Sequence, residues 1–222
     1  MIEITVLMAL VERYDLPMCA NYRPPKQERF SLFDRPLPDF SFGEAYPGSF
    51  APALTNFDPK MWVPACFGLV PGWAKDATLA RHTYNARTET VAEKPSYRTA
   101  WKKRQFCIIP ADCFFEPNYE TGKPIRWRIE RADKRPFGIA GIWERTQKEG
   151  LPGWSMSMLT INADEHPLMK RFHKPGDEKR SVVVLEDDNW DQWLNAKSEA
   201  DVRSILRLFD PETMIGQADP RT

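Results

Sequence analysis

The sequence predicts one α+β domain, with a mixed, barrel-like β-sheet at its core and a few helices at its periphery. Apolar runs are short and numerous from Met61 onward, and regular crossover helices do not separate them. Helical patterns are few, and no internal repeat or change in composition marks a domain boundary. The 222 residues are 42% hydrophobic and 28% charged, so the chain can bury a large core.

The first predicted strands follow an irregular stretch. Residues 22–60 are rich in Pro, Phe, Asp and Ser without a clean period, which predicts an irregular wrap with one short helix at 25–33. Residues 61–70 predict a strand that runs into a turn at 71–73. Residues 105–110 and 112–116 predict two more strands, separated by a break at Pro110.

The later strands have clearer patterns. Residues 125–130 alternate apolar and charged side chains, which predicts a strand with one face in water. Residues 137–143 predict a buried strand whose glycines permit close approach of its neighbours. Residues 155–161 and 181–185 predict the remaining two strands.

Three further helices are predicted, the first over residues 96–104 and the second over residues 187–194. The third begins at Ser198, which is a good N-cap residue. One face of this helix is apolar and consists of Val202, Ile205, Leu206 and Phe209. The tail after Asp210 is predicted to be loop.

Charge and cysteine content exclude several classes of protein. Lys and Arg number 31, as do Asp and Glu, which excludes a globally basic nucleic-acid-binding protein but not a local basic groove. The spacing of the cysteines and histidines does not match a structural zinc site, so we expect neither a metal nor a cofactor. No secretory signal is visible, so we expect reduced thiols at Cys19, Cys66, Cys107 and Cys113.

The first seventeen residues contain an apolar stretch that is too short to span a membrane, and no other run approaches membrane length. An acidic residue replaces the basic start of a secretory signal, and no small-residue cleavage site follows. Residues 1–17 are expected to be a short amphipathic helix, or an untranslated or removed extension ahead of a domain over 18–222. We expect a cytoplasmic protein.

Cys19 directly follows Met18 and precedes a small residue, so a chain starting at Met18 would expose Cys19 once that Met is removed. An N-terminal cysteine carries a thiol with a pKa of about 8.5 and an α-amine with a pKa of about 8. Together these nucleophiles condense with an aldehyde, first to an imine and then to a thiazolidine. An internal cysteine lacks the amine, and the alternative interpretation is an ordinary buried cysteine.

Four other positions carry groups suited to phosphate or proton chemistry. In an extended chain Asn85, Arg87 and Glu89 point to one face, where they would hold a phosphate and orient a polar intermediate. Glu116 follows two phenylalanines, and partial desolvation there would suit it to general acid–base work. The alternatives are a solvated strand face and a strand-end glutamate in water.

Of the three histidines, His173 is the candidate proton shuttle, because it lies in a basic segment just before the strand at 181–185. His166 is its rival, and His82 lies in a loop of mixed character. A purely structural histidine is the alternative at each position.

Residues 94–104 interleave aromatic and basic side chains, which suits single-stranded nucleic acid because bases stack on rings while cations bind phosphates. Trp73, at the predicted turn, adds another exposed ring. The alternative is an amphipathic surface helix. The basic members of a local groove would be Arg87, Arg98, Lys102, Lys103 and Arg104.

The order of these blocks resembles the SOS response-associated peptidase (SRAP) family. The resemblance runs from Met18 to about Trp193 and implies an SRAP-like fold. It rests on Met18-Cys19, Phe67-Gly-Leu-Val-Pro-Gly-Trp73, Asn85-Ala-Arg-Thr-Glu-Thr90, Cys107-Ile-Ile-Pro-Ala-Asp-Cys-Phe-Phe-Glu116, Ala140-Gly-Ile-Trp-Glu144, Thr160-Ile-Asn-Ala through Phe172-His173, and Val182-Val-Val-Leu185.

The resemblance implies a sensor of abasic sites in single-stranded DNA. We expect a monomer, the default for a protein that binds single strands, and we expect it to associate with the nucleoid when bound to damage. Such a protein crosslinks to the site as a thiazolidine, after autoproteolytic exposure of its N-terminal cysteine. The resemblance implies that Cys19 is the nucleophile, Asn85 holds the intermediate, Glu116 is the acid–base group and His173 transfers protons. It also implies a phosphate contact at Arg87 and an aromatic wedge at Trp73 and Tyr97, whereas the DNA contact expected at Arg98 rests on the basic groove described above.

Two of the places at which the chain departs from the family pattern concern contacts with DNA. The usual Cys-Gly-Arg start is Cys19-Ala-Asn-Tyr-Arg23 here, so the arginine contact is made by Arg23 or lost. A usual His-x-Arg-Met-Pro stretch is replaced by residues 173–181, which leaves Arg180 as the candidate contact. Two other functions stay open: a thiol peptidase using Cys19, His173 and Glu116, and a non-catalytic module that binds single-stranded DNA reversibly.

Overall fold

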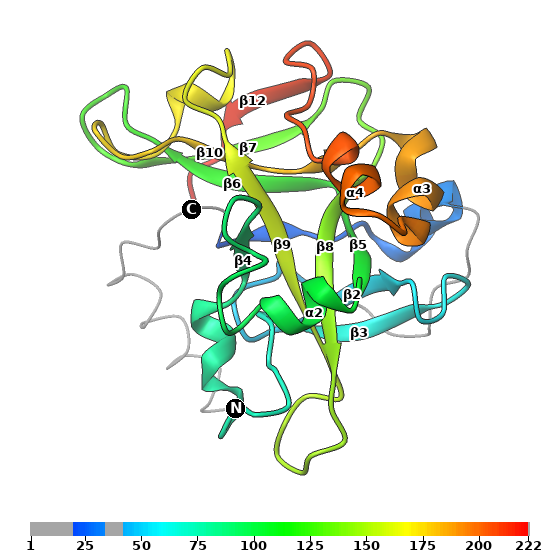
Figure 1. The fold of residues 1–222 in the computed structure, drawn as a ribbon. Helices are drawn as coiled ribbons and strands as arrows, with labels where there is room; N and C mark the ends of the chain where they lie inside the picture. The colour runs from blue at the N-terminus through cyan, green and yellow to red at the C-terminus, as the bar shows by residue number, and fades with distance from the viewer. Residues whose placement is uncertain (1–19, 34–41, 222) are drawn as a thin grey trace.

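The computed structural model describes residues 20–33 and 42–221, and the strands among them form two sheets (Figure 1). The larger sheet has eight strands: β2 (Phe50–Thr55), β3 (Trp62–Phe67), β4 (Asn85–Arg87), β5 (Phe106–Ala111), β8 (Phe137–Arg145), β9 (Trp154–Asn162), β10 (Arg180–Val182) and β11 (Val184–Leu185). The smaller sheet has four strands: β1 (Tyr22–Arg23), β6 (Cys113–Asn118), β7 (Ile125–Arg131) and β12 (Met214–Ala218).

Five strands of the larger sheet close into a barrel. Around the ring, β2 pairs with β5, β5 with β8, β8 with β9, β9 with β3, and β3 with β2. The pairing between β3 and β9 is parallel and the other four are antiparallel. The prediction of a single α+β domain with a mixed, barrel-like sheet is therefore confirmed.

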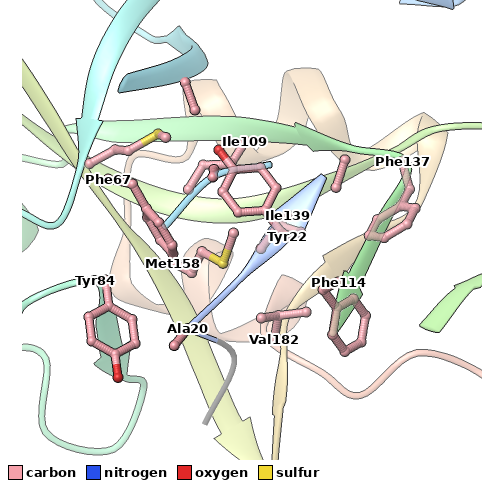
Figure 2. Packing of buried hydrophobic residues seen from close by; sticks show 14 of the residues in the cluster. Ala20, Tyr22, Phe67, Tyr84, Ile109, Phe114, Phe137, Ile139, Met158 and Val182 are labelled. Carbon is pink, nitrogen blue, oxygen red and sulfur yellow. The ribbon is translucent and has the colours of Figure 1, made fainter. Parts of the chain in front are cut away.

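Strand β5 shows how the core is divided, because successive side chains of a strand point to opposite faces. Cys107 and Ile109 belong to one hydrophobic cluster, which also contains side chains of the smaller sheet such as Tyr22 and Phe114 (Figure 2). Phe106 and Ile108 belong to a second cluster with the apolar side chains of the C-terminal helices. The barrel is thus covered by the smaller sheet and by helices.

Glycines in β8 allow close packing, as the sequence predicts. A Cβ added to Gly138 would come within 2.6 Å of Ile108 Cγ2 and 2.7 Å of Trp190 Cζ2. Both neighbours belong to well-packed elements, so a larger residue at Gly138 would force them apart.

The helices are short and peripheral. They are the 3-10 helices η1 (Gln27–Phe33), η2 (Ala77–His82), η3 (Met169–Arg171) and η4 (Asp187–Asn189), and the α-helices α2 (Arg98–Lys102), α3 (Trp190–Asn195) and α4 (Glu199–Ile205). The predicted helices near 25–33, 96–104 and 187–194 are all present. Helix α4 begins at Ser198, whose hydroxyl accepts from the Asp201 amide in a capping box. None of the described helices is both long and apolar enough to cross a membrane.

Three expectations are wrong. The tail after Asp210 contains strand β12, whose five residues pair with β7. Residues 22–60 contain strands β1 and β2, and β2 carries Pro52 opposite Pro64 of β3, although proline usually argues against a strand. Pro110 does not break the chain, because it lies inside β5 and pairs with Gly138. In each case partner strands, rather than local preference, determine the structure.

Candidate active site at the end of strand β6

A buried carboxylate–imidazole pair lies near the end of β6. Glu116 Oε2 and His173 Nε2 are 3.0 Å apart, and the two side chains are 1% and 4% exposed. Glu116 alternates with Phe115 and Pro117 along β6, so it lies on the same face as the core residue Phe114. The structure thus brings together two of the four residues predicted for catalysis.

The backbone holds His173 in an unusual conformation. Its φ is 66°, in the left-handed region that non-glycine residues rarely adopt. Its N–H donates to the carbonyl of Pro117 over 2.9 Å, and the preceding Phe172 forms a β-bridge with Asn118. Strain of this kind persists where surrounding structure enforces it, and it is common at functional sites.

Hydrogen bonds also assign the tautomer of His173. The backbone N–H of Arg180 donates to Nδ1 over 3.4 Å, so Nδ1 is an acceptor. The proton of the neutral ring is then on Nε2, which donates to Glu116. Both ring nitrogens are therefore engaged within the protein.

The N-terminal segment lies directly beside this pair. Tyr22 pairs with Phe114 in the antiparallel ladder between β1 and β6, and the Phe115 N–H donates to the Asn21 carbonyl over 3.0 Å. The two strands are antiparallel, so the chain before Asn21 runs toward the end of β6 that carries Glu116. Ala20 is 7% exposed and belongs to the hydrophobic cluster that contains Cys107 and Ile109 (Figure 2). Cys19, which is bonded to Ala20, lies outside the described residues.

Strand β4 carries the predicted polar face. Asn85 and Arg87 flank the buried Ala86 and so share the opposite face, whereas Glu89 follows in a turn. Tyr97 supports this strand, because its hydroxyl donates to the Asn85 carbonyl over 2.9 Å. Burial raises the pKa of Tyr97 to about 12. The Tyr97 ring packs in the second cluster, and its contact with DNA stays a prediction.

A charged network joins β4 to β10. The side chain of Arg180 is 1% exposed and bonds Glu178 Oε1 at 2.5 Å and Glu89 Oε2 at 2.7 Å. Arg87 Nη1 bonds the other oxygen of Glu178 at 2.7 Å. Burial alone would raise the pKa of Glu89, but the hydrogen bond from Arg180 lowers it. Two positive and two negative charges therefore balance here, and Arg87 and Arg180, two of the predicted DNA-binding arginines, already have carboxylate partners.

The other predicted DNA contacts differ in exposure. Trp73 is 58% exposed in the turn after β3. Arg98 and Lys102 are exposed on α2 beside an open hollow of about 860 Å³, and neither forms an ion pair with a residue that the structure describes. Arg23 instead bonds Glu44 at 2.8 Å.

The other cysteines are buried free thiols at positions 66, 107 and 113. Burial raises the pKa of Cys66 to about 11 and that of Cys113 to about 12, and it also raises that of Cys107. Thiols that stay protonated are poor nucleophiles, so none of these three rivals Cys19. Within residues 20–33 and 42–221 no group of three or more His, Cys, Asp or Glu side chains forms a metal site.

The rival histidine, His166, has a structural role. Its Nδ1 accepts from the Met169 N–H over 3.1 Å, and its Nε2 lies 2.9 Å from the Phe209 carbonyl oxygen. These bonds connect η3 to the segment after α4, and neither of them involves Glu116.

The sequence analysis missed three charged residues that organise this region. Glu178 lies two residues before Arg180, and the only feature of the sequence that could have drawn attention to it is that it is a carboxylate inside a basic segment. Arg126 lies in the alternating strand β7, whose pattern predicts a face in water, yet Arg126 is only 19% exposed. Glu44 lies in the stretch interpreted as irregular, and it bonds Arg126 at 2.8 Å.

Comparison with known proteins reveals relatives over most of the chain. The family model described as SOS response associated peptidase (SRAP) matches residues 38–217. The abasic site processing protein YoqW of Bacillus subtilis (strain 168) is 36% identical over 152 residues, which are 67% of this chain and 64% of YoqW. The abasic site processing protein YoaM of the same organism is 30% identical over 203 residues, which are 83% of this chain and 86% of YoaM.

Solved structures share the fold. A crystal structure of a Bordetella bronchiseptica protein matches with a TM-score of 0.82 and 33% identity, covering 91% of this chain and 100% of that one. A crystal structure of a Bacteroides thetaiotaomicron protein matches with a TM-score of 0.77 and 23% identity, covering 90% and 91% of the two chains.

Proposed function

The chain belongs to the SOS response associated peptidase family, and from this premise we propose that it crosslinks to abasic sites in single-stranded DNA through Cys19. The observation that carries the proposal is the antiparallel pairing of β1 with β6, which directs the chain before Asn21 toward the end of β6 where the buried Glu116–His173 pair lies. The names of YoqW and YoaM, both abasic site processing proteins, support the choice of substrate.

The proposed active form begins at Cys19. Residues 1–18 are removed by autoproteolysis, or translation starts at Met18 and that Met is removed. The freed α-amine adds to the C1′ aldehyde of the ring-opened deoxyribose, and the resulting carbinolamine loses water to give an imine. The Cys19 thiolate then adds to the imine carbon while the nitrogen takes up a proton. Aldehyde, amine and thiol thus give a thiazolidine and one water, without an oxidant or a cofactor.

The proposed roles follow the positions of the groups. Glu116 takes a proton from the attacking amine and returns it to the hydroxyl that leaves as water. In its protonated form His173 donates a proton to the sugar ring oxygen as the ring opens and becomes neutral, and Glu116 stabilises the imidazolium before the transfer. Asn85 holds the polar intermediate from β4. Arg87 and Arg98 contact phosphates, so binding should weaken as salt rises.

Thiol peptidase activity is the rival to this proposal. A thiol peptidase needs a histidine with one nitrogen toward the thiol and the other toward an acid. In this protein His173 Nε2 faces Glu116, and Nδ1 accepts a hydrogen bond from the backbone N–H of Arg180. The nitrogen that would have to face the thiol is therefore already bonded to the backbone, which disfavours a thiol peptidase. We therefore limit the proposed proteolysis to the single peptide bond before Cys19.

A denaturing gel tests the proposal. Protein with Cys19 verified as its N-terminus is mixed with single-stranded DNA that carries one abasic site, and with an undamaged strand. A covalent band is expected only with abasic DNA. Cys19→Ala should abolish it completely, whereas Cys66→Ala, a matched change at a buried thiol, should retain it. Protein that still carries residues 1–18 should give no band until these are removed.

Three results would contradict the proposal. Absence of a band from protein with a verified N-terminal Cys19 would exclude crosslinking. Hydrolysis of added peptides under the same conditions would favour the peptidase. Reversible binding that is equal for intact and abasic strands, and indifferent to Cys19→Ala, would favour the non-catalytic binding module.

A further inference from the structure

Arg126 contacts four segments that are far apart in the sequence, one of which is the chain that follows Cys19. Its guanidinium carbon lies 3.4 Å from the centre of the Phe115 ring on β6. Its Nη2 donates to Asn21 Oδ1 over 3.0 Å and to both oxygens of Glu44, over 2.8 and 2.9 Å. Its Nη1 donates to Asp219 Oδ2 over 3.3 Å, just beyond β12. We call Asn21, Glu44, Phe115, Arg126 and Asp219 the N-terminal clamp.

Glu44 is the second centre of the N-terminal clamp. Besides Arg126 it accepts hydrogen bonds from Arg23 over 2.8 Å and from Asn21 Nδ2 over 3.4 Å. The next residue, Ala45, exchanges two backbone hydrogen bonds with Tyr22, of 3.2 and 2.8 Å. Residues 21–23 are therefore held by β6 on one side and by residues 44–45 on the other.

Strand β1 needs this support because it is only two residues long. Two ladder pairs fix direction poorly at the end of a chain, where segments usually fray. A planar guanidinium that stacks on a ring and donates in several directions is well suited to fix such a segment. The N-terminal clamp reaches Asn21, two residues after Cys19, and the intervening Ala20 is buried.

We propose that Arg126 is a positioning residue for Cys19, an inference that rests on the proposed function. By fixing Asn21 through the N-terminal clamp, Arg126 orients the amine and the thiol of Cys19 toward Glu116. Small displacements of a reacting group lower rates strongly, so loss of Arg126 should slow crosslinking without weakening DNA binding. Arg126 itself needs no contact with DNA for this role.

The N-terminal clamp should work over the whole pH range of interest. Burial alone would raise the pKa of Glu44, but hydrogen bonds from Arg23 and Arg126 lower it to about 2. A carboxylate with a lowered pKa stabilises the fold fully above its unfolded pKa, near 4.5. That stabilisation is lost only as the pH falls toward 2. Loss of the clamp should therefore slow crosslinking to the same extent at neutral and at mildly acidic pH.

The test compares Arg126→Met with Arg128→Met. Arg128 lies two residues further along β7 and bonds only Glu130 among described carboxylates, at 3.4 Å, so it is a matched control. At saturating abasic DNA, Arg126→Met should lower the single-turnover rate of adduct formation by about 10- to 100-fold. Its affinity for an intact strand should stay unchanged, and Arg128→Met should behave as the unaltered protein. Added guanidinium ion should partly restore the rate of Arg126→Ala.

Hydrogen exchange provides a readout that does not need crosslinking. The Tyr22 amide, which donates to the Ala45 carbonyl, should lose protection in Arg126→Met and keep it in Arg128→Met. If Arg126→Met fails to fold, Arg126→Lys supplies the same two measurements. An unchanged rate in a folded Arg126 variant would overturn the positioning role alone. Absence of adduct from the unaltered protein would overturn the proposed function, which separates the two failures.

Discussion

The buried Glu116–His173 pair and the exposed cations of α2 are two polar regions of opposite character. Glu116 and His173 are almost inaccessible and are fixed by hydrogen bonds to each other and to backbone groups. Arg98 and Lys102 extend into solvent beside an open hollow. Fixed, water-excluded groups move protons without reorganisation, whereas exposed cations attract phosphates and are screened by salt. The rate of crosslinking and the affinity for DNA should therefore be separable.

The largest effect is expected for Glu116→Gln. An amide of the same shape cannot accept the proton, so the single-turnover rate of adduct formation should fall by about 10²- to 10⁴-fold. Affinity for an intact strand, measured by fluorescence anisotropy, should not change, because Glu116 is buried and in the proposed arrangement meets only the reacting atoms of an abasic site.

Glu144 provides the matched control for this substitution. It is another buried glutamate, on β8, and burial raises its pKa. Glu144→Gln should crosslink at the unaltered rate. Equal loss of rate in both variants would indicate a general effect of replacing a buried carboxylate, and the assignment of Glu116 would be wrong.

Helices and strands with a strong local sequence pattern could be predicted. Strands that form only because a neighbouring strand pairs with them could not. Strand β7 alternates visibly, and the capped helix α4 begins where its N-cap residue predicts. Strand β12 has no comparable pattern, and it is a strand because its backbone pairs with the edge of β7. The same holds for β2, whose proline is accepted opposite another proline.

The candidate site divides in the same way. Glu116 and His173 could be named from sequence, but they are 57 positions apart, and their contact depends on the left-handed backbone of His173. Arg126 and Glu178 could not be named, because each becomes important only through partners from other elements. Reactive groups are visible in a sequence, whereas the side chains that position them appear only in the fold.

A double substitution of α2 tests the binding region. Arg98→Gln with Lys102→Gln removes two exposed cations, so the slope of log affinity against log salt should become shallower by about 1.4 for single-stranded DNA. The rate at saturating DNA should not change. Affinity is measured for one intact strand over a series of salt concentrations.

A matched pair, Lys60→Gln with Lys123→Gln, changes the net charge equally on two other exposed turns. This pair should leave the slope nearly unaltered. If both double variants lowered the slope by the same amount, binding would follow the overall charge and not a groove at α2.

The smallest effect is expected for Glu178→Gln, in the network between the two regions. Glu178 bonds Arg87, which is half-exposed, so it occupies the guanidinium that we propose to meet a phosphate. Arg180 keeps Glu89 and the Thr160 carbonyl as partners, so the variant should fold. Exposed ion pairs are worth up to about 1 kcal/mol, and affinity for single-stranded DNA should therefore rise about two- to fivefold.

Glu186→Gln separates this local effect from a change in net charge, because Glu186 pairs with exposed Arg207 at 2.6 Å and has no link to β4. The rate at saturating DNA should be the same in both variants and in the unaltered protein. A rise in affinity confined to Glu178→Gln would show that a carboxylate of the protein competes with DNA for Arg87. If Glu178→Gln left the affinity unchanged, Arg87 would serve only to connect β4 with β10, and DNA binding would rest with the exposed cations of α2.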